Sequence, residues 1–437
     1  MAARRDREAR FTSLMHHITP ERLRSAYQAI NPKATAGVDG MTWDAYGQDL
    51  DTRIQDLHDR VQRGGYRVSP SRRAYIPKAD GSTRPLGVST LEDKIVQRAL
   101  AEVLNAIYEV DFLGFSYGFR PGRNPHQALD AVTVAIESRK VNWVLDADIR
   151  GFFDALDHDR LEALIGHRIG DPRVLRLIHK MLIAGVMEEG EWRESDRGSP
   201  QGASLSPLLA NIYLHYTLDV WAHAWRQSEA RGEVYLVRFA DDFLVCFQYK
   251  DDAQRFQTTL ARRLAEFSLE LHTTKTRLIE FGRFAAKNRQ DRGEGKPETF
   301  DFLGFTHMCS RTREGKFAVR RKSMRKRMAA KLRSIREQLM LIRHAPIRAQ
   351  GHWLRSVVQG WFNYHAVPWN STTLKRFRDA VCRAWLRALR RRGQKHRLTW
   401  SRFARQCKPY LPAPRILHPW PAARFAMRLT QGRSPVR

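Results

Sequence analysis

The chain has 437 residues, of which 42% are hydrophobic and 28% charged, so it is long enough and apolar enough for two or three globular domains. Its net charge of +30 points to a polyanionic partner, and its four isolated cysteines exclude a disulfide framework and a paired-cysteine zinc site. It contains neither the apolar core of a signal peptide nor an apolar run of about 18 residues, so we expect a soluble, cytoplasmic protein that crosses no membrane.

The first part of the chain predicts helices followed by a basic hairpin. The sequence to about residue 65 has mostly helical spacing. Two basic, β-prone arms then flank Asp80 and Gly81, which is a hairpin signal. Lys78 and Arg84 lie on these arms, where they are either solvated strand charges or cations that bind phosphate.

The next segment predicts a buried helix and then a loop. Residues 91–108 have the apolar spacing of a helix that faces a core. Residues 116–123 are loop-like and contain Arg120 and Arg123. We expect these two arginines to contact the backbone of a nucleic-acid template.

Two separate stretches end in aspartates. An apolar strand beginning at Trp143 carries Asp146 and Asp148, which share one face because side chains alternate along a strand. Taken alone, an aspartate at a strand end is usually a helix cap. Farther along, Asp241 and Asp242 interrupt two apolar, β-rich runs, which predicts a hairpin with both carboxylates at its tip.

The adjacent carboxylates of Asp241 and Asp242 need compensation. They repel each other and lose solvation among apolar neighbours, so they persist if protonated, turned to water or faced by a cation. A solvated turn is the ordinary interpretation of such a pair. With Asp148 as a third carboxylate, the set predicts an oxygen-rich site for two Mg²⁺ ions, as polymerase chemistry requires.

The order of these motifs resembles the palm of a reverse transcriptase. The motifs are Asp148–Asp154, Gly198–Pro207 and Phe239–Asp242, and nearly the whole chain is similar to the bacterial group II intron-encoded reverse transcriptase/maturase family. Further segments carry the likeness: Gly37–Gly40, Ile76–Lys78, Arg84–Gly87, Ser116–Arg123, Phe300–Phe305 and Gly360–Tyr364. Phe239 stands where the family more often has Tyr, which removes a hydroxyl and keeps the ring.

The resemblance implies an α+β fold: a right-hand polymerase whose fingers and palm contain an antiparallel sheet, followed by an α-helical thumb/maturase domain. The expected fingers and palm span residues 1–310, with 1–65 as an N-terminal helical part, 66–145 as fingers and 146–310 as palm. The thumb/maturase (X) domain would span 311–410, and 411–437 would be a proline-containing basic tail whose proline-rich stretch, residues 411–421, is extended. About 16 residues follow Pro421, so no endonuclease domain is expected.

The resemblance also assigns roles around the nucleotide. Asp148, Asp241 and Asp242 would be catalytic and would hold two Mg²⁺ ions, for which Mn²⁺ can substitute, with the backbone carbonyl of Ile149. The other nucleotide contacts would come from Lys78, Arg84, Phe153, Gln201 and Lys275.

These contacts have distinct expected chemistry. Lys78 and Arg84 would bind the triphosphate, and Gln201 would hydrogen-bond a nucleotide or template sugar. Phe153 would collide with a ribose 2′-hydroxyl and so favour deoxynucleotides, although either it or Phe152 is expected to be core. Lys275 would act on the leaving phosphate or is an ordinary surface lysine.

The last part of the chain carries the positive charge. Residues 301–437 hold 33 Lys/Arg against four acids, whereas residues 1–300 hold 43 against 42. The runs Arg311–Arg336 and Lys375–Arg397 each predict an amphipathic helix with cations outward, and residues 285–297 predict an exposed loop.

Contacts with RNA or with the primer end are expected from this part. Phe302, Leu303 and Gly304 would hold the primer end, although they are equally suited to a sheet core. The tryptophans here either stack on bases or, more usually, form a helical core. The cations expected to bind an RNA backbone are Arg321, Lys322, Arg325, Lys326, Arg376, Arg383, Arg387 and Arg391.

The sequence thus predicts an RNA-directed DNA polymerase of a group II intron that also binds its intron RNA and assists splicing and retrohoming. Its partners would be the intron RNA, an RNA template, a DNA primer or target and deoxynucleotides, with nucleoid association when it is on DNA. Two alternatives remain: a reverse transcriptase recruited to host defence, and an RNA-binding splicing cofactor with a vestigial polymerase site. A folded ribozyme in the DNA flanking the gene would favour the intron.

Overall fold

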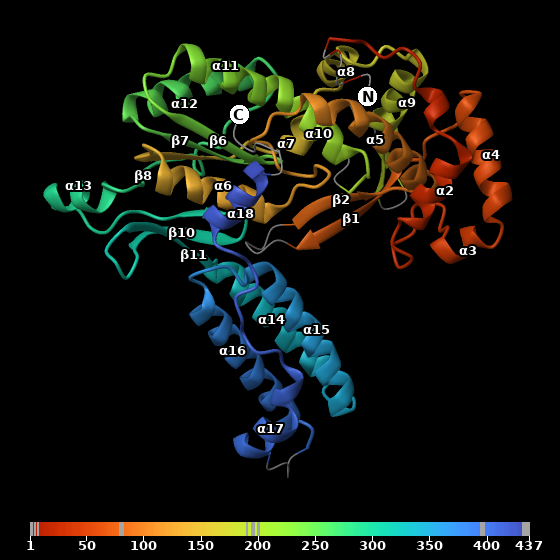
Figure 1. Ribbon diagram of the computed structural model, residues 1–437. Coiled ribbons are helices and arrows are strands. Elements are labelled where there is room, and N and C mark those ends of the chain that lie inside the picture. The colour runs from red at the N-terminus through yellow and green to blue at the C-terminus, as the bar shows by residue number, and fades with distance from the viewer. Residues whose placement is uncertain are drawn as a thin grey trace. The chain divides into compact units, whose positions relative to one another are not determined.

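The computed structural model describes residues 3, 6, 8–77, 83–188, 191–193, 197–198, 202–393 and 398–430. They form two compact units, each made of separate stretches of the sequence (Figure 1). The first contains residues up to Ala128 and Leu145–Leu278, and the second contains Leu129–Val144 and the residues from Ile279. The fingers, palm and thumb boundaries remain a prediction, because these compact units are a different kind of division.

The first unit begins with helices, as the sequence predicted. They are η1 (Met15–His17), α2 (Pro20–Gln28), α3 (Trp43–Gly47) and α4 (Leu50–Gln62). The long helix α5 (Leu91–Asp111) confirms the predicted core-facing helix, since Ile95, Leu100 and Leu104 are fully buried. It begins where the Thr90 hydroxyl accepts the Asp93 N–H, which satisfies a donor of the first turn.

The first sheet of this unit contains the predicted basic hairpin. Its strands are β1 (Ser71–Pro77), β2 (Thr83–Val88), β4 (Val186–Glu188) and β5 (Glu191–Arg193), in the order β2-β1-β4-β5. Strands β1 and β2 are antiparallel, with Ile76 opposite Arg84. The hairpin is therefore confirmed in its two arms, while the predicted tip at Asp80 and Gly81 lies outside the described residues.

A second sheet carries the aspartates. Its strands are β3 (Trp143–Ala147), β6 (Val234–Phe239), β7 (Asp242–Phe247) and β8 (Arg277–Glu280), in the order β6-β7-β3-β8. Figure 1 shows α11 (Val220–Ser228) and α12 (Lys250–Ala265) on the side of β6 and β7. The rings of Phe247 and Phe256 pack there, with centroids 5.4 Å apart, so an apolar core holds this face.

Shorter helices complete the first unit. These are α7 (Phe152–Ala155), α8 (His158–Gly166), α9 (Pro172–Ile183), α10 (Ser206–Leu214) and the π-helix η2 (His215–Asp219), which leads directly into α11. Within the described residues, no helix of the molecule combines the length and the apolar character needed to span a bilayer.

The second unit combines a helix, a small sheet and a helical bundle. Most of α6 (Pro125–Ser138) belongs to it, together with β9 (Phe300–Phe302), β10 (Phe305–Arg311) and β11 (Phe317–Ser323). The three strands are antiparallel in the order β11-β10-β9. With the sheets of the first unit, this gives the predicted α+β fold.

The bundle contains the long helices α14 (Arg325–Leu341), α15 (Ile347–His365) and α16 (Ser371–Arg390), which lie side by side in Figure 1. Their core includes Leu354, Phe362 and Trp385, each at most 1% exposed. Three short helices follow: α17 (Trp400–Gln406), η3 (Lys408–Tyr410) and α18 (Pro421–Thr430). The buried Trp385 supports the core interpretation of the aromatic residues.

Two local predictions for this unit were wrong. Residues 285–297 do not form only a loop, because α13 (Ala285–Asp291) occupies part of them and buries Ala285. The basic run Arg311–Arg336 is not one helix, because β11 precedes α14 and alternates its buried residues as a strand does. The prediction of an extended proline-rich stretch agrees with the structure, since residues 411–420 contain neither helix nor strand and α18 begins only at Pro421.

A buried charge cluster joins distant parts of this unit. Asp130 on α6 and Arg321 on β11 are each about 3% exposed and lie 2.9 Å apart. Arg424 on α18 lies 3.1 Å from the other Asp130 oxygen. Burial raises the pKa of Asp130, and the two arginines oppose that rise. The cluster therefore ties α6, β11 and the end of the chain together.

His307 on β10 should make the folded chain acid-sensitive. Its ring is fully buried and stacks on the Phe300 ring, with ring centroids 4.6 Å apart. Burial lowers its pKa to about 3. Below pH 6.5 the unfolded chain binds a proton that folded His307 does not, so the free energy of unfolding should fall by up to about 1.4 kcal/mol per pH unit.

Urea unfolding at pH 7.5 and pH 5 measures this contribution. The His307→Phe variant should lose less stability between the two pH values than the wild type. The control His344→Gln, at an exposed histidine, should lose as much as the wild type. Equal losses in all three proteins would contradict the assignment.

Candidate active site

The β6–β7 hairpin closes with a two-residue turn, Ala240 and Asp241. Phe239 pairs with Asp242 across the turn, and Ala240 has φ +57°, in the left-handed region that a tight hairpin turn requires. Asp241 is half-buried and Asp242 is exposed. The turn therefore presents two carboxylates at one end of the sheet, as the sequence predicted.

Asp148 follows β3 and is fixed by a neighbouring segment. Its backbone carbonyl accepts the His272 N–H at 2.8 Å, and Ile149 forms an antiparallel bridge with Leu271. Its carboxylate oxygen Oδ2 accepts a hydrogen bond from Lys275 Nζ at 2.9 Å. The structure thus brings together two predicted site residues that are 127 positions apart in the sequence.

The electrostatics link Asp148, Asp241 and Arg84. Burial raises the pKa of Asp241, and the carboxylate of Asp148 raises it further, whereas the positive charges of Arg84 and Arg238 lower it. The two carboxylates are thus close enough to repel each other. Arg84, an exposed residue of β2, is close enough to offset part of that repulsion.

These carboxylates fit a divalent cation in their chemistry. Hard carboxylate oxygens are the ligands that Mg²⁺ prefers, and a cation would relieve the repulsion that raises the pKa of Asp241. In the described part of the chain, no three His, Cys, Asp or Glu side chains are gathered closely enough to hold a metal. In this structure the positive charge next to Asp148 is the ammonium group of Lys275, which forms an ion pair with its carboxylate.

A buried arginine that the sequence analysis did not single out supports the turn. Arg238 is 0% exposed and donates two hydrogen bonds to the carboxylate of Asp219, at 2.7 and 2.5 Å. Its third nitrogen, Nη1, donates to Asn211 Oδ1 and to the Ala240 carbonyl, both at 3.0 Å. Arg238 therefore connects the turn to the π-helix η2. Its burial could have been predicted from the sequence, because Arg238 stands in an otherwise apolar strand.

The predicted template loop packs against the same turn. Arg238 N–H donates to the Phe115 carbonyl, and Tyr117 N–H donates to the Arg238 carbonyl, so the loop runs beside β6. The carbonyl of Gly118 accepts a hydrogen bond from Asn211 at 2.7 Å. A Cβ on Gly118 would lie 2.2 Å from the Ala240 nitrogen, so only glycine fits there.

Arg120 binds backbone carbonyls of this loop. Its burial argues against the predicted contact with a template. It is 6% exposed, pairs with Glu109 at 3.0 Å and donates to the carbonyls of Leu113 and Ser116 at 2.8 Å. Arg123 is half-buried, donates to the Gly114 carbonyl and lies over the Tyr117 ring. Its template contact stays a prediction.

The other nucleotide contacts stay predictions. Phe152 is buried, and Phe153 is half-buried beside it with ring centroids 5.4 Å apart, so Phe152 is the core residue of the two. Lys275 and Arg84 lie near the carboxylates as described above. Lys78 and Gln201 lie outside the described residues.

The predicted RNA and primer residues of the second unit differ in exposure. Phe302 is buried in the sheet, and the Leu303 carbonyl accepts a hydrogen bond from the Tyr364 hydroxyl next to Gly304, whose φ is +85°. Arg321 is held by Asp130 in the interior, which argues against an RNA contact. The remaining cations are exposed: Lys322, Arg325, Lys326, Arg376, Arg383, Arg387 and Arg391.

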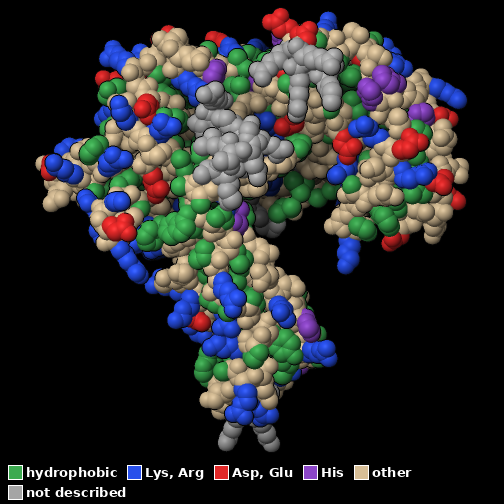
Figure 2. Space-filling view, in the orientation of Figure 1, with side chains coloured by type: hydrophobic (Ala, Val, Ile, Leu, Met, Phe, Trp, Pro, Cys, Tyr) green, Lys and Arg blue, Asp and Glu red, His purple; other side chains and the backbone are tan. Residues whose placement is uncertain are grey.

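The exposed cations of the bundle meet few acids. Figure 2 shows Lys and Arg side chains spread over the visible face of these helices. Lys322, Arg325, Lys326 and Arg376 line one hollow of about 970 Å³ in the second unit. This surface is suited to a polyanion.

Comparison with known proteins identifies the family. Residues 76–307 match the family described as reverse transcriptase (RNA-dependent DNA polymerase). The chain is 35% identical over 240 residues to Protein YkfC of Escherichia coli (strain K12), covering 48% of this chain and 63% of that protein. It is 38% identical over 207 residues to the group II intron-encoded protein LtrA of Lactococcus lactis subsp. cremoris, covering 47% of this chain and 34% of LtrA.

A plant relative is more distant. The chain is 30% identical over 161 residues to Nuclear intron maturase 3, mitochondrial, of Arabidopsis thaliana, covering 37% of this chain and 21% of that protein. The chain thus spans less than two thirds of the length of each of these three relatives. The family match covers more than half of the chain and contains Asp148, Asp241 and Asp242. The chain therefore belongs to the reverse transcriptase (RNA-dependent DNA polymerase) family.

Proposed function

We propose that this protein is the RNA-directed DNA polymerase of a group II intron, and that it also binds its intron RNA to assist splicing and retrohoming. The observation that carries the proposal is the approach of Asp148 and Asp241 at the hairpin turn, with Arg84 close enough to act on them. The name of LtrA as a group II intron-encoded protein supports the intron assignment. The protein would act in the bacterial cytoplasm, and at the nucleoid when it is on DNA.

The proposed mechanism assigns a role to each side chain at the turn. Asp148, Asp241, Asp242 and the Ile149 carbonyl would hold two Mg²⁺ ions, which supply activation of a primer 3′-hydroxyl and stabilisation of the leaving pyrophosphate. Arg84 and Lys78 would bind the triphosphate, and Gln201 would orient the nucleotide. Lys275 holds its protons beside Asp148 Oδ2 and would present them to the leaving phosphate.

Primer extension tests the proposal. The purified full chain is mixed with an RNA template, an annealed DNA primer, Mg²⁺ and deoxynucleotides. We expect extension to the end of the template. A protein that binds structured RNA tightly at low salt and extends nothing would support the splicing cofactor instead. A gene without a flanking ribozyme would support recruitment to host defence.

Phe153 should exclude ribonucleotides. Truncation to alanine opens the space expected beneath the sugar, so Phe153→Ala should raise incorporation of ribonucleotides relative to deoxynucleotides at least about tenfold. Single-nucleotide extension with paired dNTP and rNTP measures this ratio. Phe284→Ala, at an exposed phenylalanine of the second unit, is the control and should leave the ratio unchanged. An unchanged ratio in Phe153→Ala would contradict the sugar-gate role.

The exposed face of α16 should bind an RNA backbone. Replacement of Arg383 and Arg387 by glutamine removes two cations, so the slope of log affinity against log salt should decrease by about 1.5. Filter binding of a structured RNA between about 50 and 300 mM salt measures the slope. The control replaces the exposed Arg63 and Arg67 of the first unit and should keep the slope. Equal slopes for both variants would place the contacts elsewhere.

A further inference from the structure

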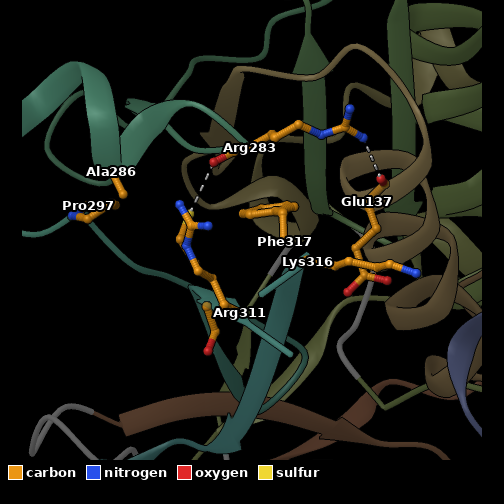
Figure 3. Close-up of a pocket in the computed structure, with 10 residues that line it drawn as sticks. Glu137, Arg283, Ala286, Pro297, Arg311, Lys316 and Phe317 are labelled. Atoms are coloured by element: carbon orange, nitrogen blue, oxygen red, sulfur yellow. Dashed lines mark hydrogen bonds between the residues drawn. The ribbon is translucent and has the colours of Figure 1, made fainter. Parts of the chain in front are cut away.

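A cavity of about 500 Å³ lies in the second unit, and its lining residues differ from those assigned above. It is formed by the end of α6, the start of α13 and the hairpin of β10 and β11, and Figure 3 shows the side chains that line it. They combine three cations, one carboxylate and one aromatic ring: Arg283, Arg311, Lys316, Glu137 and Phe317. This combination limits which ligand the cavity can accept.

The three cations have no carboxylate partner in the part of the chain that the structure describes. Arg283 donates to the backbone carbonyl of Glu137 at 3.3 Å, and Arg311 donates to the Gly315 carbonyl at 3.2 Å. Lys316 is exposed beside them. Among the residues that the structure describes, none of the three forms an ion pair. Their charge is therefore available to an anion such as a phosphate, whose oxygens an arginine fork binds in pairs.

Glu137 adds a requirement that a phosphate alone does not meet. Its Oε1 accepts the Val319 N–H at 2.7 Å, and burial raises the pKa of the carboxyl. The other oxygen accepts no hydrogen bond from the described residues, and the side chain lines the cavity. An ionised carboxylate only accepts, so the ligand group that meets it must present hydrogen-bond donors, either N–H or O–H.

Phe317 supplies a third feature. Its ring is half-buried and forms part of the wall between Lys316 and Arg311. A planar heteroaromatic group can stack on such a ring, and unpaired bases of RNA do so routinely. Phosphate, N–H donors and a planar ring occur together in a nucleotide. Guanine fits Glu137 best, because its N1–H and N2–H₂ point side by side at one carboxylate.

We infer that this cavity binds one unpaired guanine nucleotide of an RNA strand, with the base on Phe317 and Glu137 and the flanking phosphates on Arg283, Arg311 and Lys316. The inference rests on the proposed function in one respect, which is that RNA is the partner. It adds a base-selective site in the second unit, separate from the carboxylates at the hairpin turn.

Binding of short RNAs tests the inference without using polymerase activity. Fluorescence anisotropy compares labelled UUGUU with UUUUU on the full chain at about 150 mM salt, and unlabelled GMP serves as competitor. We expect UUGUU to bind at least about tenfold more tightly than UUUUU. Glu137→Gln keeps the acceptor for Val319 N–H and removes the carboxylate, so it should abolish this preference while UUUUU binds as before.

Two double variants that remove the same charge distinguish binding in the cavity from non-specific electrostatic attraction of RNA. Arg311→Gln with Lys316→Gln should weaken both RNAs at least fivefold. Arg333→Gln with Arg336→Gln removes the same charge from an exposed part of α14 and should weaken them less than twofold. Thermal unfolding of each variant shows whether it is folded, and Phe317→Leu replaces Glu137→Gln if the latter unfolds.

Several outcomes would overturn the inference. Equal affinity of the wild type for UUGUU and UUUUU would remove the base site, as would a guanine preference that survives Glu137→Gln and Phe317→Leu. GMP that competes as well as UUGUU would indicate a site for a free nucleotide, not for RNA. Primer extension by the same preparation separates the two proposals, since a protein that extends primers and shows no guanine preference loses only this one.

Discussion

Asp148→Asn should abolish primer extension, with a fall in kcat of at least about a thousandfold. Asparagine has nearly the same shape and can still accept the hydrogen bond from Lys275 Nζ, so the fold should persist. It lacks the negative charge that would hold a divalent cation, and such a cation contributes several kcal/mol to the transition state. Single-turnover extension on an RNA template measures the loss.

Asp146→Asn is the matched control for this prediction. Asp146 lies two residues earlier, within β3, and 3.8 Å from Arg277. It has no assigned role at the turn, so its variant should keep kcat within about threefold of the wild type. A large loss in Asp146→Asn, or substantial activity in Asp148→Asn, would contradict the choice of carboxylates.

Arg238→Met should cost both stability and activity. It leaves the fully buried Asp219 without its partner, which typically lowers the free energy of unfolding by about 3–5 kcal/mol. The double variant Arg238→Met with Asp219→Asn removes both charges and should recover much of that stability. It should still be about a hundredfold slower in kcat, because the Ala240 carbonyl at the turn has lost its donor.

A second buried pair of the first unit controls for the general effect of such a change. Arg168 and Asp111 lie 2.9 Å apart and are at most 9% exposed. Arg168→Met with Asp111→Asn should lower the unfolding free energy and leave kcat near that of the wild type. If the Arg238 double variant regained full activity with its stability, Arg238 would be a stabilising residue and not a positioning one.

Local patterns explain what the sequence could predict. The aspartates at the β6–β7 turn follow from alternating apolar residues and turn chemistry, and both signals lie within a few residues. Helix α5 follows from apolar spacing over many turns. The exposed cations of α16 follow from the same amphipathic spacing, since Leu374, Phe377 and Val381 are buried between them.

The missed features depend on partners that are far apart in the sequence. The sequence alone does not show the ion pairs of three buried arginines: Arg120, Arg238 and Arg321. Each is buried because it pairs with a carboxylate that only the fold brings next to it. Helix α13 and strand β11 were missed because their charged residues obscure a short run of buried ones. The cavity at Glu137 is lined by residues from three separate segments, so no local sequence pattern could predict it.

The buried cluster around Asp130 has a consequence for protein synthesis. Arg321 is 191 residues farther along the chain, and Arg424 follows later still. At a translation rate of about 5–20 residues per second, Asp130 would leave the ribosome about 10–40 s before Arg321, the first of its two arginine partners to be made. During that interval the carboxylate of Asp130 lacks both of the arginines that pair with it in the folded chain. The second unit should therefore complete its fold only after Arg424 has left the ribosome.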